Sequence, residues 1–264
     1  MKTDSSSPNQ ITDYLLTRAD YNLSQQSLNL KQSQVQDEMD FLGGIGRSFK
    51  IISEYQVEDP FAPESPLVVN IGCLTGTAYM TGLRTYFTAY SPLKRTIQGA
   101  PMASWSAMSG SFGRKYRSIG LDDLVLTGRA ARPSILVLRQ GSDGPEISLD
   151  DAPGSMIGAV TPEKFKWLNE NYNQPGKRKY HAHFSVIGPA GENWDKVWYA
   201  CIVGSTQEQL MSGEDKFRFA GRLGMGSVLG SKNILAIVAY AEKDEYPKGD
   251  ERLKPINQEI GRGD

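Results

Sequence analysis

Four glycines and three cationic side chains are packed into the stretch Phe217-Arg218-Phe219-Ala220-Gly221-Arg222-Leu223-Gly224-Met225-Gly226-Ser227-Val228-Leu229-Gly230-Ser231-Lys232-Asn233. Glycine lets a backbone turn tightly and come close to a ligand. Backbone amides freed by such a turn, with Arg218 and Arg222 beside them, can form a cradle for an anion such as phosphate. The alternative is a plain glycine-rich turn before the apolar segment 234–240, with arginines that are merely solvated.

The same stretch also carries a packing signal. Gly226 and Gly230 are four residues apart, so on a helix they share one face and allow another backbone to approach closely. Neither G-x-x-x-x-G-K-[ST] nor a G-x-G-x-x-G placed after a strand is present, so the two common nucleotide-binding fingerprints do not apply.

The composition is that of an ordinary globular protein. The chain has 264 residues, 39% of them hydrophobic and 22% charged, and a net charge of −1. This balance argues against broad nucleic-acid binding and against polybasic membrane attachment. The sequence has no apolar run long enough to span a bilayer and no signal peptide, so a cytoplasmic location is expected. Cys73 and Cys201 are expected to be buried free thiols, and two cysteines cannot ligate an iron–sulfur cluster alone.

The pattern of elements predicts an α+β fold with mixed β-sheets and a few helices. Residues 14–30 read as two strands joined by a turn, and Gln34–Phe41 as a short helix closed by Gly43, Gly44 and Gly46. Further strands are expected at 67–73, 85–90, 124–128, 135–138, 183–187 and 198–203, with 124–128 and 135–138 paired. We expect a disordered tail over residues 1–12, one domain over 13–245 and a polar C-terminal tail over 246–264. No repeat is evident in the sequence.

Side chains suited to catalysis do not group in the sequence, and the catalytic residues are unknown at this stage. His181 and His183 lack a third metal ligand and are expected at the surface, so no metal-ligating residue is assigned. Asp122 and Asp123 are expected to be solvated. What does recur is a turn with glycine and arginine, at Arg47, Arg84, Arg114 and 218–222, although a plain helix stop explains Arg47 equally well. Such turns suit a polyanionic cofactor.

Four stretches, in order, resemble the N-terminal domain of the tungsten-containing aldehyde ferredoxin oxidoreductases. They are Phe41-Leu42-Gly43-Gly44-Ile45-Gly46-Arg47, then Gly72-Cys73-Leu74-Thr75-Gly76-Thr77 with Thr81-Gly82-Leu83-Arg84 and Ser91-Pro92-Leu93, then Ile187-Gly188-Pro189-Ala190-Gly191-Glu192-Asn193, and finally 220–233, which is similar to the family's A-G-R-G-G-x-G-x-V-x-G-S-K-N. The resemblance covers roughly residues 14–241, or about the first third of a full-length family member.

The resemblance implies a β-sheet base on which two pterins, joined through tungsten or molybdenum, lie. Arg84 would meet the phosphate side of one pterin, and Arg218 with the 220–224 turn the other. The implied cofactor-binding residues are Gly46, Arg47, Arg84, Ser109, Gly110, Arg218, Phe219, Ala220, Gly221, Arg222 and Gly224. Magnesium is a further candidate ion. A [4Fe–4S] cluster is expected only on a partner chain that also carries the substrate domain and passes electrons to a ferredoxin-type acceptor.

Two of the chain's departures from the family pattern bear directly on the expected site. Ala107 stands where the family's A-N-S-G-G-x-F-G has the asparagine that would help to hold magnesium, and Leu223 replaces a glycine of the main cradle. Two readings follow. The chain is the pterin-binding subunit of a split oxidoreductase acting on aldehyde or oxo groups, or it is a non-catalytic scaffold or carrier for the cofactor. The aromatic group of Trp194, Trp198 and Tyr199 is a candidate partner contact, and packing in the core is the alternative for it.

Overall fold

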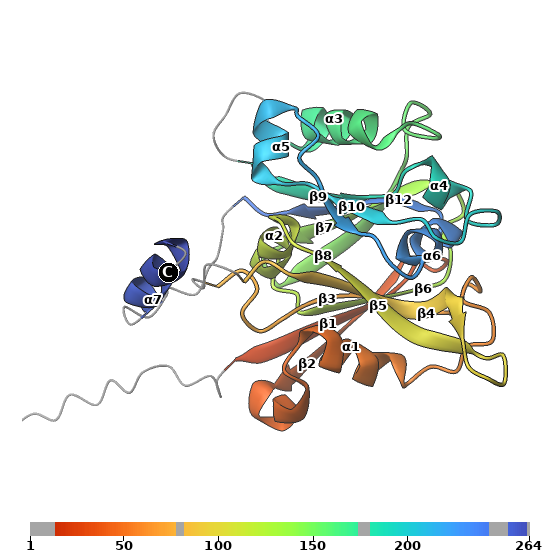
Figure 1. The fold of residues 1–264 in the computed structure, drawn as a ribbon, viewed down its shortest axis with the longest axis horizontal. Coiled ribbons are helices and arrows are strands. Elements are labelled where there is room, and N and C mark those ends of the chain that lie inside the picture. Colours follow the sequence, from red (N-terminus) through yellow and green to blue (C-terminus); the bar gives the residue numbers. More distant parts are fainter. Residues whose placement is uncertain (1–13, 78–81, 174–179, 243–252, 263–264) are drawn as a thin grey trace, which may run out of the picture.

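Two six-stranded sheets, stacked face to face, form the body of the computed structural model (Figure 1). The structure describes residues 14–77, 82–173, 180–242 and 253–262. The tail expected over residues 1–12 therefore lies outside the described residues. The C-terminal segment that was expected to be a polar tail contains a helix, α7 (Leu253–Arg262). Among the described residues, no helix is both long and apolar enough to cross a membrane.

The first sheet, sheet A, has the strand order β2-β1-β6-β3-β4-β5. Only β1 and β6 run parallel, and every other neighbouring pair is antiparallel. The strands are β1 (Leu15–Asn22), β2 (Ser27–Gln34), β3 (Leu67–Ile71), β4 (Thr85–Arg95), β5 (Pro101–Met108) and β6 (Asp123–Thr127). The short helix η2 (Val35–Phe41) and helix α1 (Gly44–Ile52) follow β2, and α2 (Phe112–Ser118) follows β5.

The second sheet, sheet B, has the order β11-β10-β9-β12-β7-β8, with β7 and β12 as its parallel pair. Its strands are β7 (Ser134–Gln140), β8 (Pro145–Asp151), β9 (Ala182–Val186), β10 (Ile202–Gly204), β11 (Arg218–Ala220) and β12 (Ile234–Tyr240). Its helices are α3 (Thr161–Tyr172), α4 (Pro189–Glu192), α5 (Gln207–Ser212) and α6 (Met225–Ser231). In Figure 1, α3 and α5 cover the outer face of sheet B, and α1 covers that of sheet A.

The two sheets repeat one topology, which the sequence did not reveal. Each half starts with a hairpin, continues through a helix, three antiparallel strands and a second helix, and ends on a strand that returns parallel to the first. Thus β1 to β6 correspond to β7 to β12, α1 to α3, and α2 to α6. A trace of the repeat remains in the sequence, because Ile71-Gly72 follows β3 and Ile187-Gly188 follows β9.

The core lies between the sheets and is almost wholly apolar. Fully buried side chains from both halves, among them Phe87, Tyr116 and Ile237, form one cluster, which extends through Phe184 to Phe165 of α3 on the outer face of sheet B. A smaller cluster of Ile51, Ile52, Val68 and Val125 fixes α1 to the outer face of sheet A. At about 25 cal/mol for each Å² of apolar surface removed from water, this burial is the main term that holds the two halves together.

The expected elements are largely confirmed, with three exceptions. The segments 124–128 and 135–138 are strands, but they do not pair: β6 belongs to sheet A and β7 to sheet B, because the chain crosses between the halves there. Gly43 and Gly44 start helix α1 and do not simply end η2. The predicted strand at 198–203 is reduced to the three residues of β10.

Several burial predictions were wrong. Asp122 and Asp123 are buried because both carboxylates have partners: Asp122 accepts the Thr17 N–H at 2.8 Å, and Asp123 pairs with Arg47. Burial raises the pKa of Asp123 to about 6, even though the Arg47 guanidinium opposes the shift.

Two further side chains also differ from expectation. His183 is buried, and its Nδ1 lies 3.0 Å from the Ser205 Oγ. Cys73 is exposed, because it lies in the turn after β3 and not in the strand, whereas Cys201 is partly buried; both are free thiols.

Candidate cofactor-binding face

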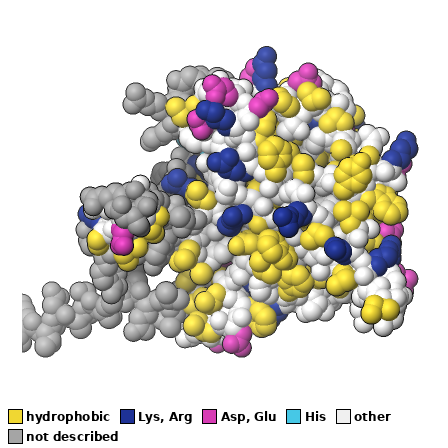
Figure 2. All heavy atoms as spheres, viewed as in Figure 1, with side chains coloured by type: hydrophobic (Ala, Val, Ile, Leu, Met, Phe, Trp, Pro, Cys, Tyr) yellow, Lys and Arg dark blue, Asp and Glu magenta, His cyan; other side chains and the backbone are white. Residues whose placement is uncertain are grey.

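One edge of each sheet meets the other at the candidate site. Strand β5 ends sheet A and strand β11 ends sheet B, and the segment from β11 to α6 runs along β5. In Figure 2, Lys and Arg side chains lie among hydrophobic ones near the middle of this face, whereas Asp and Glu lie toward its margins. The sequence explains the charge, since neither residues 65–121 nor residues 216–241 contain Asp or Glu. We call the surface formed by β5 and by the segment from β11 to α6 the cradle face.

The turn after β5 contacts the start of β11. A Cβ on Gly110, which has φ +112°, would lie 3.3 Å from the Arg218 Cγ and 3.1 Å from the Ser205 carbonyl oxygen. Glycine is therefore required there both by its backbone conformation and by this close approach. Arg84 lies close to the same turn in the sheet, because it directly precedes Thr85 of β4, and Thr85 pairs with Met108 at the end of β5. Arg84 and Arg218 are both exposed.

The turn after β11 is fastened to sheet A by two buried serines. The Arg222 N–H donates to the Ser106 Oγ at 3.1 Å, and the Ser91 Oγ donates to the Leu223 carbonyl at 2.9 Å. Ser91 and Ser106 are 0% and 4% exposed. The turn after β5 and the turn after β11 are thus each held by residues from the other half of the domain. Sequence reasoning missed both serines, because they lie more than 110 residues from the turn that they hold.

The four glycines of the opening stretch have two different roles. Gly221 is exposed, and a Cβ there would come no closer than 3.9 Å to the Phe219 Cβ, so its open side faces solvent. Gly224 has φ +75°, and a Cβ there would overlap the Trp198 carbonyl oxygen. Gly226 and Gly230 are buried on one face of α6, where the backbone at Ala200–Cys201 and at Gly191 comes close. The predicted close packing at Gly226 and Gly230 is confirmed, and Gly224 has a packing role as well.

Gly46 and Arg47 lie apart from this group. Both are in helix α1, on the outer face of sheet A. Arg47 is 5% exposed and its guanidinium pairs with Asp123 and, at 3.3 Å, with Glu38. These contacts occupy Arg47 in the attachment of α1 to the sheet. The remaining candidates lie directly before β4, in β11 and in the turns that follow the edge strands β5 and β11; they are Arg84, Ser109, Gly110, Arg218, Phe219, Ala220, Gly221, Arg222 and Gly224.

Comparison with known proteins decides the family. The family model "Aldehyde ferredoxin oxidoreductase, N-terminal domain" matches residues 20–241. The chain belongs to this family. The "Tungsten-containing aldehyde ferredoxin oxidoreductase" of Pyrococcus abyssi is 32% identical over 185 residues, which are 70% of this chain and 26% of that protein. The corresponding protein of Pyrococcus horikoshii is 31% identical over the same coverage.

Two further matches extend over more of the chain. The "Aliphatic sulfonate oxidoreductase, WOR-like subunit" of Pyrococcus furiosus is 26% identical over 235 residues, 83% of this chain and 33% of that protein. The solved "Active site complex BamBC of Benzoyl Coenzyme A reductase in complex with 1,5 Dienoyl-CoA" matches with a TM-score of 0.75 and 24% identity, over 93% of this chain and 34% of that one. This likeness confirms the fold. The chain spans between a quarter and a third of the curated relatives' length.

Within the aldehyde ferredoxin oxidoreductase N-terminal domain family, Leu223 is an unusual residue for its backbone conformation. Where the family pattern has glycine, Leu223 has φ +61°, in the left-handed region. An L-residue there costs about 1–2 kcal/mol, a cost that glycine avoids. The glycine of the family pattern would adopt this backbone conformation without that cost.

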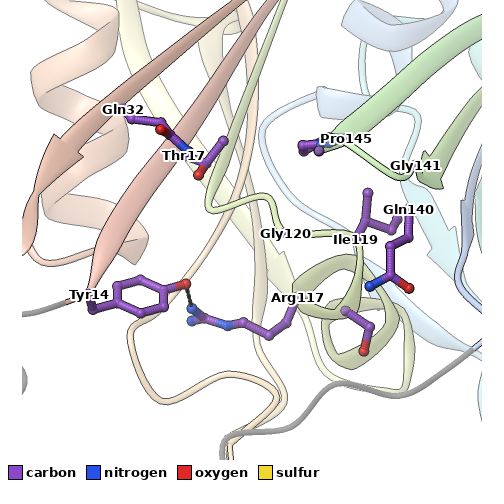
Figure 3. A pocket seen from close by; sticks show the side chains of 11 residues that line it. Tyr14, Thr17, Gln32, Arg117, Ile119, Gly120, Gln140, Gly141 and Pro145 are labelled. Atoms are coloured by element: carbon purple, nitrogen blue, oxygen red, sulfur yellow. Dashed lines mark hydrogen bonds between the residues drawn. The ribbon is translucent and has the colours of Figure 1, made fainter. Parts of the chain in front are cut away.

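A large cleft lies elsewhere on the molecule. It has a volume of about 570 Å³ and opens where β1 and β2 approach the β7–β8 hairpin, with Tyr14, Thr17, Arg117 and Gln140 in its lining (Figure 3). The Arg117 guanidinium is fully used, since it donates to Tyr14, to Asp122 and to the backbone carbonyls of residues 72, 73 and 75. These contacts leave it no donor for a ligand.

Proposed function

We propose that this chain binds a metal-carrying bis-pterin on the cradle face and acts as the pterin-binding subunit of a tungsten or molybdenum oxidoreductase for aldehyde or oxo groups. The observation that carries the proposal is the composite site itself: the 109–110 and 221–224 turns, one from each half, lie side by side, and they come from segments that contain no Asp or Glu and that carry exposed arginines. The tungsten named in the 30–32% identical relatives supports tungsten as the metal.

The residues present fit the anionic parts of such a cofactor. Arg84 binds the phosphate side of one pterin, and Arg218 and Arg222 bind that of the other through charge-assisted hydrogen bonds. The open side of Gly221 admits the cofactor close to the backbone, and the exposed Phe219 offers an apolar surface beside it. Ala107 has no side-chain oxygen, so this chain contributes no ligand at that position to a magnesium ion. When bound, the metal supplies the two-electron chemistry; the chain binds, orients and shields.

The proposal includes a partner chain that carries a [4Fe–4S] cluster and the substrate domain and delivers electrons to a ferredoxin-type acceptor. The word "subunit" in the name of the Pyrococcus furiosus relative supports a multi-subunit arrangement. Trp198 and Tyr199 are 47% and 71% exposed, which suits the proposed contact. Trp194 packs against Phe61, with ring centroids 5.2 Å apart, and is partly used within the domain. A cytoplasmic location is part of the same proposal.

A second candidate function is a cofactor carrier or assembly scaffold. Ala107 and Leu223 favour it, because both depart from the family's pattern inside the site. The test is purification of a tagged full chain from its native host at native expression level, followed by analysis of pterin, tungsten, molybdenum and iron. Pterin and metal together with an iron-containing partner support the subunit, and pterin with no partner supports the carrier. A chain that comes alone and free of pterin contradicts both.

A further inference from the structure

Ser106 bonds to the backbone of the cradle face directly beside Leu223, which has a positive φ. Its Oγ accepts the Arg222 N–H at 3.1 Å, directly before Leu223 with its φ of +61°. The family's A-N-S-G-G-x-F-G has alanine where this chain has Ser106, and its A-G-R-G-G-x-G has glycine where this chain has Leu223. The Ser106 hydrogen bond therefore joins one departure to Arg222, the residue directly before the other departure, Leu223, although 116 residues separate the two bonded groups.

We infer that Ser106 is a positioning residue whose hydroxyl holds the Arg222–Leu223 turn in the left-handed conformation that a leucine disfavours. The hydroxyl thereby fixes the backbone from which the Arg222 side chain projects onto the cradle face. This inference rests on the proposed function, in which Arg222 binds a phosphate of the cofactor. A glycine in place of Leu223 would need no such restraint, because it adopts positive φ without steric cost.

The contact has a second consequence for anion recognition. The Arg222 N–H points at Ser106, so it is not available to an anion. The Leu223 carbonyl is also engaged, by Ser91 at 2.9 Å. At this turn, recognition therefore depends on the Arg218 and Arg222 side chains more than on backbone donors, and it should weaken steeply as salt is added.

A double-mutant cycle on the full chain tests the inference, with the wild type, Ser106→Ala, Leu223→Gly and the combination. Pyrophosphate is the probe, measured by calorimetry. With Leu223 in place, loss of the hydrogen bond should weaken pyrophosphate binding about fivefold and lower Tm by about 2–4 °C. In the Leu223→Gly background, the same Ser106→Ala change should alter affinity by less than about twofold, because the restraint is no longer needed.

Ser104→Ala is the matched control. Ser104 lies two residues away on the same face of β5, but its hydroxyl bonds within the strand, to the Met102 carbonyl at 3.3 Å. This variant should leave affinity unchanged. Equal losses from Ser106→Ala in both backgrounds, or an equal loss from Ser104→Ala, would overturn the inference.

If neither the wild type nor any variant binds pyrophosphate, the proposed function loses its support. The role of Ser106 is then tested separately, by the NMR signal of the Arg222 amide. Its ¹H–¹⁵N resonance should move on Ser106→Ala far more in the chain that keeps Leu223 than in the Leu223→Gly variant. A resonance that moves equally in both backgrounds contradicts the positioning role.

Discussion

Gly230 in α6 packs directly on the carbonyl of Gly191 in α4, so closely that a Cβ on Gly230 would overlap that oxygen. The two residues belong to different family signatures, 187–193 and 220–233. Their contact shows that the signatures act on each other: α4 supports α6, and α6 starts where the cradle turn ends. Part of the signal by which the family is identified is therefore helix packing.

The first prediction concerns this contact. Gly230→Ala should destabilise the fold by about 3 kcal/mol or prevent folding, since overpacking against backbone leaves no flexible atom to move. Gly154→Ala, where nothing lies within 4 Å, should change stability by less than about 0.5 kcal/mol. Urea denaturation followed by circular dichroism measures both. Equal stabilities for the two variants would contradict the packing role.

The second prediction separates glycines that pack from glycines that admit a ligand. Gly221→Val should leave the unfolding transition within about 0.5 kcal/mol of wild type, because open space surrounds the added side chain, and it should abolish pterin retention. Gly224→Val should instead disrupt folding, since its side chain would overlap the Trp198 carbonyl. Pterin content per folded chain is the readout. Full retention in Gly221→Val would place the cofactor elsewhere.

The third prediction concerns the arginines. Arg218→Ala should weaken cofactor or pyrophosphate binding by roughly 1.5–3 kcal/mol, the range for hydrogen bonds to charged groups. Arg132→Ala is the control, because Arg132 is exposed and pairs only at the surface, with Asp151 at 3.1 Å. Binding is measured by calorimetry at low salt. If Arg132→Ala costs as much as Arg218→Ala, the effect is general electrostatics and not a site.

The fourth prediction concerns Lys232, the lysine of the last signature. Its Nζ is buried and donates to the carbonyls of Ser65 at 2.6 Å, Pro63 at 3.2 Å and Gly128 at 3.4 Å. Burial lowers its pKa to about 7, although three carbonyl acceptors favour the ammonium form, and on that geometry we expect it charged at neutral pH. Lys232→Met should cost about 3–5 kcal/mol, because it leaves buried carbonyls unpaired.

The control for Lys232 is Lys166→Met, at an exposed position on α3. Thermal unfolding should separate the two variants by many degrees. A Lys232→Met protein as stable as the Lys166→Met protein would show that the hydrogen bonds from the Lys232 ammonium to the three carbonyls do not contribute to stability.

The fifth prediction is a pH dependence of stability from Asp123. Its pKa is raised from 3.8 to about 6 by burial, so between these values the folded state binds more protons than the unfolded state. Stability should therefore rise as pH falls from about 6.5 to 4, opposite to an ordinary surface carboxylate. Asp123→Asn should remove this component. Denaturation of both proteins at pH 4, 5, 6 and 7 tests it, and a wild-type minus variant difference that is flat with pH refutes it.

Local patterns predicted the fold class, most strands and the helical glycine pair, because period and turn chemistry act over a few residues. They did not predict long-range relationships. The topological repeat was missed because the halves share only traces such as Ile71-Gly72 and Ile187-Gly188. Asp123 was expected in solvent because its partner Arg47 is distant in sequence, and Asp122 because its backbone donor Thr17 is distant as well, although its second partner, Arg117, is only five residues away. Within the site, the arginines and glycines could be named, but the serines that hold the turn could not.

Because each half of the domain holds a turn of the other half, the order in which the ribosome makes the chain matters for the site. The turn after β5 rests on Ser205 and Arg218, and the turn after β11 rests on Ser91 and Ser106. A nascent chain that has emerged only as far as β6 has the first turn but not the residues that support it. Neither turn is complete until β11 has left the ribosome and docked on β5. Under the proposed function, cofactor loading is therefore confined to the finished domain, and an interrupted translation product has no assembled place for it.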